Sequence, residues 1–225
     1  MNFLLLNSGP CDAAFNMALD AALLEAMPRL QKPILRFYGW SEPAATFGYF
    51  QRFAEVERAT LLRPLVRRPT GGGMVPHDAD WTYSLAFPTN HQWYALKAVE
   101  SYCRVHEWIQ RAFVELNVVT ELAPGCKKSA PGQCFAGHEQ FDLLWHGRKI
   151  AGAAQRRTRD GLLIQGSVQP PPVALARTAW QSAMCAAAKA ESQGEPIEFV
   201  PDPLLVGRAA GLRLQYAGAA YNQKR

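Results

Sequence analysis

Hydrophobic residues recur along the chain with two spacings, one typical of helices and one typical of strands. In residues 12–27 they return every three or four positions, which predicts an amphipathic helix. Asp12 is suited to cap the start of this helix, and Pro28 is expected to end it. A second and longer helical pattern covers residues 94–116, where Asn117 can terminate the helix.

Short runs rich in β-branched and aromatic residues predict strands. These runs are residues 34–38, 45–50, 65–68, 81–87, 118–122 and 162–164. Two further runs, 141–145 and 148–152, flank His146 and Gly147, which predicts a β-hairpin because Gly147 accommodates a positive φ. Helical segments separated by proline-rich breaks are expected after residue 170. Since no long linker divides the chain, we expect one α+β domain over residues 1–225.

Composition and charge narrow the classes of function. The 225 residues are 48% hydrophobic and contain no apolar run long enough to span a bilayer, and the first residues lack the basic segment of a secretory signal. We therefore expect a cytoplasmic protein that does not associate with membranes. The net charge of +5 favours acidic partners. The basic residues form no run interleaved with aromatics, so nucleic-acid binding is not expected.

The five cysteines are odd in number and contain no CxxC pair, which argues against a disulfide framework and against a zinc site. Cys134 lies in an irregular segment, residues 123–139, where a thiol could act as a nucleophile. The alternative is that Cys134 is a small buried hydrophobe. Cys126 shares the same segment and is the rival candidate, whereas the remaining cysteines are expected to be structural.

Three consecutive glycines, Gly71, Gly72 and Gly73, follow the pair Arg67 and Arg68. Backbone without Cβ atoms lets a ligand approach peptide N–H groups, and an arginine beside it offers a planar cation for a carboxylate or phosphate. The alternative is a glycine-rich turn with two solvated arginines.

Two further side chains are candidates for chemistry. His77 could be a base, but a single histidine is more often a structural hydrogen-bonding residue. Lys149 follows the hairpin turn and precedes several small residues, so its ammonium could reach a pocket, bond an acyl carbonyl and lower the pKa of a thiol. The alternative is a surface lysine.

Several segments, in this order along the chain, are together similar to one family. They are Asn16-Met17-Ala18-Leu19-Asp20, Leu35-Arg36-Phe37-Tyr38-Gly39-Trp40, Gly48-Tyr49-Phe50-Gln51, residues 67–78, Gly147-Arg148-Lys149-Ile150-Ala151-Gly152-Ala153-Ala154-Gln155 and Gln165-Gly166-Ser167. The set resembles the lipoate–protein ligase A and octanoyltransferase superfamily, which is related to biotin–protein ligase. The resemblance implies a mixed β-sheet flanked by helices, the class II biotin/lipoate ligase-like catalytic domain, without an accessory C-terminal domain.

The resemblance also implies the functional residues. Cys134 and Lys149 would be catalytic, and no metal would be held. The substrate-binding residues would be Arg68, Thr70, Gly71, Gly72, Gly73, His77, Gly152 and Ala153. Cys134 is followed by Phe135 and lies eight residues before Asp142, a placement that resembles the nucleophile of the cysteine-dependent octanoyltransferases.

We therefore expect an enzyme that takes octanoyl from acyl carrier protein through a thioester on Cys134. The acceptor would be a lysine of a lipoyl domain or of glycine cleavage protein H, and no cofactor would be required. A first alternative is an ATP- and Mg²⁺-dependent lipoate ligase, with or without a separate accessory subunit. The family also includes transfer from protein H to other lipoyl domains. A last alternative is a binding module for acyl groups or carrier proteins that does not turn over.

Overall fold

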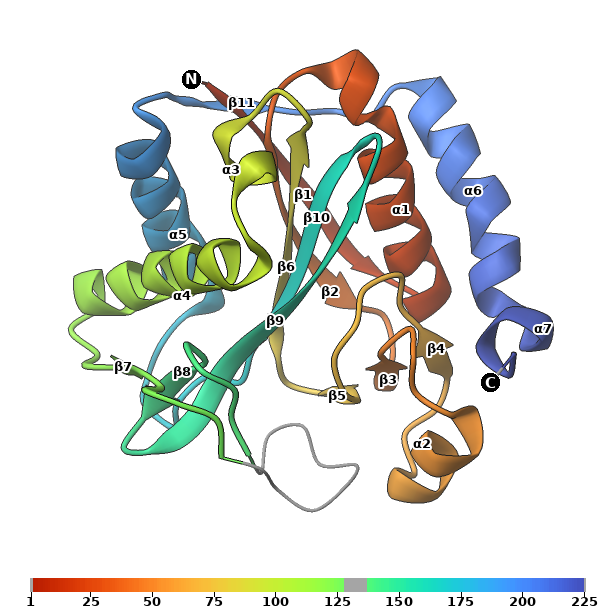
Figure 1. Ribbon diagram of the computed structural model, residues 1–225, viewed down its shortest axis with the longest axis horizontal. Helices are drawn as coiled ribbons and strands as arrows, with labels where there is room; N and C mark the ends of the chain where they lie inside the picture. The colour runs from red at the N-terminus through yellow and green to blue at the C-terminus, as the bar shows by residue number, and fades with distance from the viewer. Residues whose placement is uncertain (1, 128–136, 225) are drawn as a thin grey trace.

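The computed structural model describes residues 2–127 and 137–224. Its centre is an eight-stranded sheet with the strand order β11-β1-β2-β6-β10-β9-β8-β7 (Figure 1). The strands are β1 (Phe3–Cys11), β2 (Ile34–Trp40), β6 (Trp81–Pro88), β7 (Glu121–Leu122), β8 (Leu143–Trp145), β9 (Arg148–Thr158), β10 (Gly161–Val168) and β11 (Pro196–Glu198). The sheet is mixed, because β1 runs parallel to both β2 and β11 while β2, β6, β10, β9, β8 and β7 pair antiparallel.

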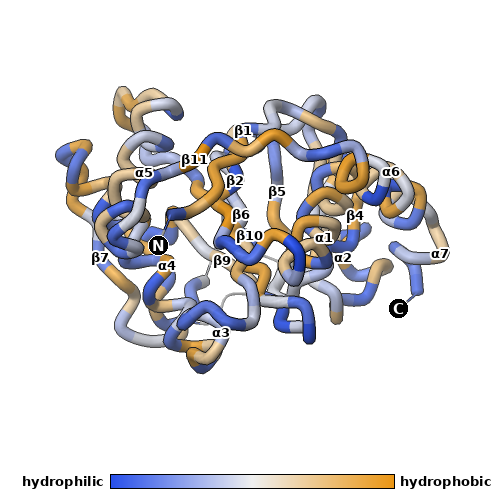
Figure 2. The backbone as a smooth tube through the Cα atoms, turned by 90° about the horizontal axis from the view of Figure 1, so that it is seen from above, coloured by the Kyte–Doolittle hydropathy of each residue, from blue (hydrophilic) through white to orange (hydrophobic). Residues whose placement is uncertain are grey.

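Helices cover both faces of this sheet. The helices are α1 (Ala13–Leu30), α3 (Gln92–Ala95), α4 (Ala98–Glu115), α5 (Arg177–Ser192), α6 (Pro203–Ala217) and α7 (Ala219–Asn222). Alternation along β2 divides its side chains between the two layers: Phe37 packs in the core that includes α4 and α5, and Tyr38 packs in the core that includes α1 and α6. Figure 2 shows apolar stretches along β1, β2 and β6, between the helices on either side. The predicted mixed sheet with flanking helices is confirmed.

A second, smaller sheet lies at the lower right in Figure 1 and has the order β4-β3-β5. Its elements are β3 (Ala44–Phe47), α2 (Phe53–Ala59), β4 (Leu65–Arg67) and β5 (Val75–His77). The glycine segment, residues 68–74, connects β4 to β5. No helix in the part of the chain described here is both long enough and apolar enough to cross a membrane.

Two of the predicted helix boundaries are wrong. α1 starts after Asp12 as expected, but it continues past Pro28 to Leu30, which packs against the core shared with α6. Residues 94–116 form two helices, because the backbone is extended at Leu96 and Lys97 and the Glu100 carboxylate accepts a hydrogen bond from the Lys97 N–H at 2.8 Å. This capping contact starts a new helix instead of continuing the old one.

The strand predictions held for the centre of the large sheet but missed β1, an inner strand between β11 and β2, and two edge strands. The central strands β2 and β6 and the 146–147 hairpin are confirmed, with φ of +47° at His146 and +72° at Gly147. The run at 118–122 contributes only β7, and the strands β1, β5 and β11 were not predicted.

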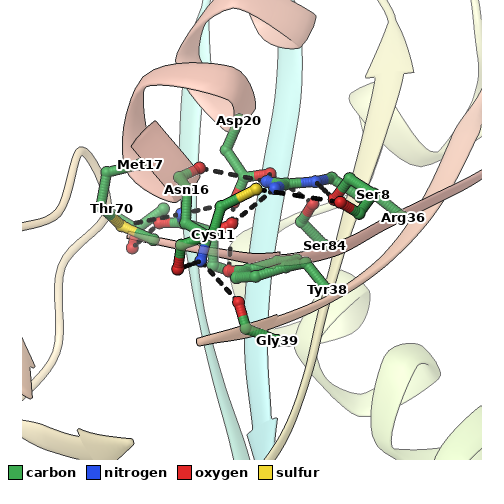
Figure 3. Close-up of polar contacts among 11 residues, drawn as sticks. Ser8, Cys11, Asn16, Met17, Asp20, Arg36, Tyr38, Gly39, Thr70 and Ser84 are labelled. Carbon is green, nitrogen blue, oxygen red and sulfur yellow. Dashed lines mark hydrogen bonds and ion pairs between the residues drawn. The ribbon is translucent and has the colours of Figure 1, made fainter. Parts of the chain in front are cut away.

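A buried ion pair joins α1 to the middle of the large sheet (Figure 3). Arg36 on β2 donates to the Asp20 carboxylate of α1 at 2.6 Å, and neither side chain is accessible to solvent. Ser84 and Gln165, on β6 and β10, each donate to the same carboxylate at 2.7 Å. Arg36 also donates to the carbonyl and the side-chain oxygen of Asn16. One helix is thereby hydrogen-bonded to three neighbouring strands.

We expect Asp20→Ala to lower the free energy of unfolding by about 3–5 kcal/mol, because Arg36 would remain buried without its counter-charge. Urea denaturation followed by circular dichroism measures this. Glu25→Ala is the matched control, since Glu25 lies on the same helix and pairs with Arg208 at the surface. That variant should lose less than about 1 kcal/mol. Equal losses in the two variants would contradict the assignment.

Candidate functional site

The glycine segment is held by close backbone contacts. Gly72 has φ of +81°, a conformation that suits glycine. A Cβ added at Gly48 would come within 1.8 Å of the Gly72 carbonyl oxygen, so Gly48 must also lack a side chain. The Tyr49 N–H donates to the Thr70 carbonyl at 2.9 Å. These contacts fix the glycine segment against the turn that follows β3.

Arg68 is folded into the glycine segment. Its Nη2 donates to the carbonyl oxygens of Gly71 and Gly73, both at 2.6 Å, and its Nη1 lies 3.4 Å from the Thr46 hydroxyl. Only 5% of the residue is exposed, so the alternative of a solvated arginine is wrong. These contacts show that Arg68 shapes the loop from inside, and its role in binding substrate stays a prediction.

Thr70 connects the glycine segment to the buried network of Figure 3. Its hydroxyl donates to Gln165 Oε1 at 2.7 Å, and the amide nitrogen of Gln165 donates to Asp20. Thr70 is fully buried. The position of the glycine segment is therefore coupled to the ion pair at the centre of the fold.

His77 has both ring nitrogens engaged. Nε2 lies 2.8 Å from the Thr46 hydroxyl and Nδ1 lies 2.8 Å from Asp80 Oδ2. The ring stacks on Trp40 with centroids 3.7 Å apart. Asp80 Oδ2 also accepts a hydrogen bond from Ser167 on β10 at 2.7 Å. This arrangement favours the structural role for His77, in which it joins β5 to the large sheet.

Lys149 is a largely buried lysine with a buried counter-ion. Its Nζ lies 2.7 Å from Asp142 Oδ2, with side-chain exposures of 12% for Lys149 and 0% for Asp142. The carboxylate also accepts hydrogen bonds from the Glu139 N–H at 2.7 Å and from the Tyr102 hydroxyl. The alternative of an ordinary surface lysine is therefore wrong.

A β-bulge in β9 determines which face of the strand carries Lys149. The pairing of β8 with β9 leaves Ile150 as an extra residue, which reverses the alternation so that Lys149 shares a face with Gly152 and Ala154. A Cβ at Gly152 would lie 2.8 Å from both Cε and Nζ of Lys149. A Cβ at Gly72 would lie 3.6 Å from that of Ala154. The same face of β9 therefore leads from Lys149 to the glycine segment.

Ala153 lies on the opposite face of β9 and packs against the core beneath α4. The structure thus brings Lys149, Gly152 and the glycine segment together and separates Ala153 from them. Its predicted contact with substrate stays a prediction.

Sequence reasoning missed two residues of α4 beside this ion pair, Tyr102 and His106, of which Tyr102 donates to Asp142. Burial and the adjacent Asp142 carboxylate raise the pKa of Tyr102 far above its usual value, so its hydroxyl remains a donor. His106, one turn later, donates from Nδ1 to the Tyr102 carbonyl at 2.8 Å. Burial lowers the pKa of His106 to about 4. The i, i+4 spacing of these two residues was the available signal, but the contact of Tyr102 with Asp142 required the fold.

The predicted nucleophile Cys134 lies outside the described residues, which resume at residue 137. On either side of the residues that are not described, Lys127 and His138 form an antiparallel bridge with backbone hydrogen bonds of 2.8 and 3.0 Å. Cys126 is exposed, while burial raises the pKa of Cys185 to about 11, as expected for a structural thiol. Among residues 2–127 and 137–224, no three His, Cys, Asp or Glu side chains gather as a metal site.

The chain is similar in sequence to one family of catalytic domains and to curated octanoyltransferases. Residues 12–170 match the lipoyl protein ligase A/B catalytic domain. Octanoyltransferase LipM of Carboxydothermus hydrogenoformans is 37% identical over 69% of this chain and 60% of its own length. The LipM of Halalkalibacterium halodurans is 34% identical, over 72% of this chain and 64% of its own length. The chain thus spans less than two thirds of these relatives.

Solved structures share the fold. A lipoate-protein ligase A with bound ATP superposes with a TM-score of 0.81 at 19% identity, covering 99% of both chains. A bi-partite lipoate protein ligase from Thermoplasma acidophilum gives 0.75 at 18% identity, covering 99% of this chain and 96% of the other. Identity this low supports the likeness of fold alone.

The buried His106 predicts a dependence of stability on pH. Its pKa is about 4 in the folded protein and about 6.5 when unfolded, so the unfolded state binds the proton first as the pH falls. Stability should therefore decrease from pH 6.5 to pH 4, by up to about 3 kcal/mol relative to a His106→Gln variant. Urea denaturation of both proteins across this range measures the difference. Parallel curves would show that His106 does not titrate in this way.

Proposed function

This chain belongs to the lipoyl protein ligase A/B catalytic domain family, and we propose that it is an octanoyltransferase of protein lipoylation. The donor is octanoyl-acyl carrier protein, and the acceptor is a lysine of a lipoyl domain or of glycine cleavage protein H. Eight curated relatives that are 33–37% identical to it are octanoyltransferases. The single observation that carries the proposal is the buried Lys149–Asp142 ion pair. It lies on the face of β9 that also contacts the glycine segment.

The first half of the reaction exchanges one thioester for another. The Cys134 thiolate attacks the carbonyl carbon of the octanoyl thioester and forms a tetrahedral oxyanion. The oxyanion collapses, the carrier's thiolate leaves and takes up a proton, and octanoyl remains bound to Cys134. Because one thioester replaces another, this step requires neither ATP nor a metal.

The second half forms an amide. The neutral ε-amine of the acceptor lysine attacks the octanoyl-Cys134 carbonyl, a C–N bond forms, and the Cys134 thiol is released. Transfer from a thioester to an amine is favourable, so no further energy source is needed. The same enzyme groups serve both halves, since both pass through an oxyanion at the same carbon.

Lys149 supplies positive charge for that oxyanion. Its ammonium donates a hydrogen bond to the developing O⁻, and it also favours the thiolate form of a nearby cysteine. Asp142 offsets the cost of burying the ammonium, and Tyr102 and the Glu139 N–H hold the carboxylate in place. Gly152 leaves room beside Nζ, and the glycine segment lets the acyl chain approach bare backbone.

Intact-protein mass spectrometry after mixing with octanoyl-acyl carrier protein, without ATP, tests the thioester route. We expect wild type to gain the mass of one octanoyl group and to lose it in hydroxylamine. Cys134→Ser should gain nothing. Cys126→Ser is the matched control from the same segment and should behave as wild type. If no adduct forms and the acceptor is labelled only with octanoate or lipoate plus ATP, the protein is a ligase.

Gly152→Ala tests Lys149 without touching its charge. The new Cβ would meet Cε and Nζ at 2.8 Å and displace the ammonium, so we expect transfer to slow by about 100-fold. Gly211→Ala is the matched control, because a Cβ there meets no atom within 4 Å. Rates are measured with the stability of each variant. A wild-type transfer rate for Gly152→Ala would contradict the proposed catalytic role of Lys149.

A further inference from the structure

Aromatic and basic side chains gather at the edge of the glycine segment. We call this set, Tyr49, Phe50, Arg156, Tyr221 and Lys224, the rim cluster. The ammonium of Lys224 lies 4.0 Å from the ring centroid of Tyr49 and 4.1 Å from that of Tyr221, and Arg156 lies 5.5 Å from the Tyr49 ring. Phe50 is 71% exposed. Two cations are thus positioned by aromatic rings at the surface.

The rim cluster is attached to the candidate site. Tyr49 donates from its N–H to Thr70, and Arg156 Nη1 donates to the Pro69 carbonyl at 3.2 Å. Arg156 shares the face of β9 that carries Gly152, about 13 Å away along the strand. A protein interface covers about 800 Å² on each partner, so one docked domain can contact the rim cluster and reach the site.

The C-terminal residues that complete the rim are fixed by a second buried arginine. Arg67 donates from its N–H to the Asn222 side-chain oxygen at 2.7 Å and from Nη2 to the Asn222 carbonyl at 2.8 Å. Its Nη1 donates to the carbonyls of Tyr49 and Gln51, both at 2.7 Å. Arg67 therefore holds the Tyr49 turn and the end of α7 together. Tyr221 and Lys224 lie outside residues 12–170, which match the family.

The charge at the rim is not neutralised within the described residues. Among these, no carboxylate lies within ion-pair distance of Arg156 or Lys224. On the neighbouring helix α2, Glu55 pairs with Arg52 and Glu57 pairs with Arg63. The rim therefore offers two positioned cations beside an exposed aromatic ring, which complements carboxylates flanked by apolar groups.

We propose that the rim cluster is the docking surface for the acceptor domain, which it binds through acidic residues near the lysine to be modified. This inference rests on the proposed function. Lysine has only a four-carbon stem, so the protein that carries it must lie directly against the rim of the site. A donor protein whose acyl group is attached to a long prosthetic arm can deliver that group without lying against the rim. The surface therefore fits the acceptor better than the donor.

Direct titration with an apo lipoyl domain, without donor or ATP, tests the proposal. We expect the double variant Arg156→Glu/Lys224→Glu to bind about tenfold more weakly than wild type, with a weaker dependence on salt. Arg159→Glu is the control for a single charge reversal, because its side chain is 95% exposed in the turn that follows β9. It should bind as wild type. Lys224→Met removes the charge but keeps an unbranched apolar side chain. It should lose less affinity for the lipoyl domain than the double variant does.

Two results would overturn the docking surface: wild-type affinity in the double variant, or an equal loss in Arg159→Glu. Circular dichroism confirms that each variant is folded before it is titrated. Failure of the proposed function is distinguishable, because it appears as a missing octanoyl adduct on the wild-type enzyme. A ligase must also bind the acceptor, so loss of binding confined to the rim variants would support the docking surface in that case as well.

Discussion

The ion pair between Asp20 and Arg36 is the constraint on which the rest of this structure depends. Two charges without access to solvent are tolerated only when their remaining hydrogen-bonding capacity is satisfied. Here Asp20 also accepts from Ser84 and Gln165, so its carboxylate joins α1 to β2, β6 and β10. Gln165 then accepts from Thr70 of the glycine segment. The same network that holds the helix on the sheet thereby positions the loop beside the candidate site.

The site itself uses departures from regular structure. A bulge at Ile150 changes the direction of Lys149, and Gly152 leaves room for its ammonium. A regular strand would have placed Lys149 on the face opposite Gly152. The buried Asp142 carboxylate then compensates for the low exposure of Lys149. A Cβ at Gly152 would meet both the Lys149 ammonium and, at 3.1 Å, Asp142 Oδ1, so Gly152→Ala disturbs the placement of the ion pair while both charged residues remain.

The two arginines before the glycines have structural contacts that the motif alone did not predict. Arg68 was a predicted substrate-binding residue, and in the structure both arginines are buried and donate to backbone carbonyls. Arg68 donates to Gly71 and Gly73 within its own loop. Arg67 donates to Asn222, which is 155 positions away in the sequence. The arginines therefore support the loop and the end of α7, whereas a role of Arg68 in binding substrate stays a prediction.

The sequence by itself determined the elements whose signals are local. The cap at Asp12, the central strands, the turn at His146 and Gly147, and Lys149 within a motif of small residues were all predicted, because each depends on a few adjacent side chains. Only the tertiary structure decided the passage of α1 through Pro28, the strands β1, β5 and β11, and the partners of Lys149 and Arg67. These depend on burial and on groups that are distant in the chain, and the free energy of a buried charge is set by whichever segments the fold brings around it.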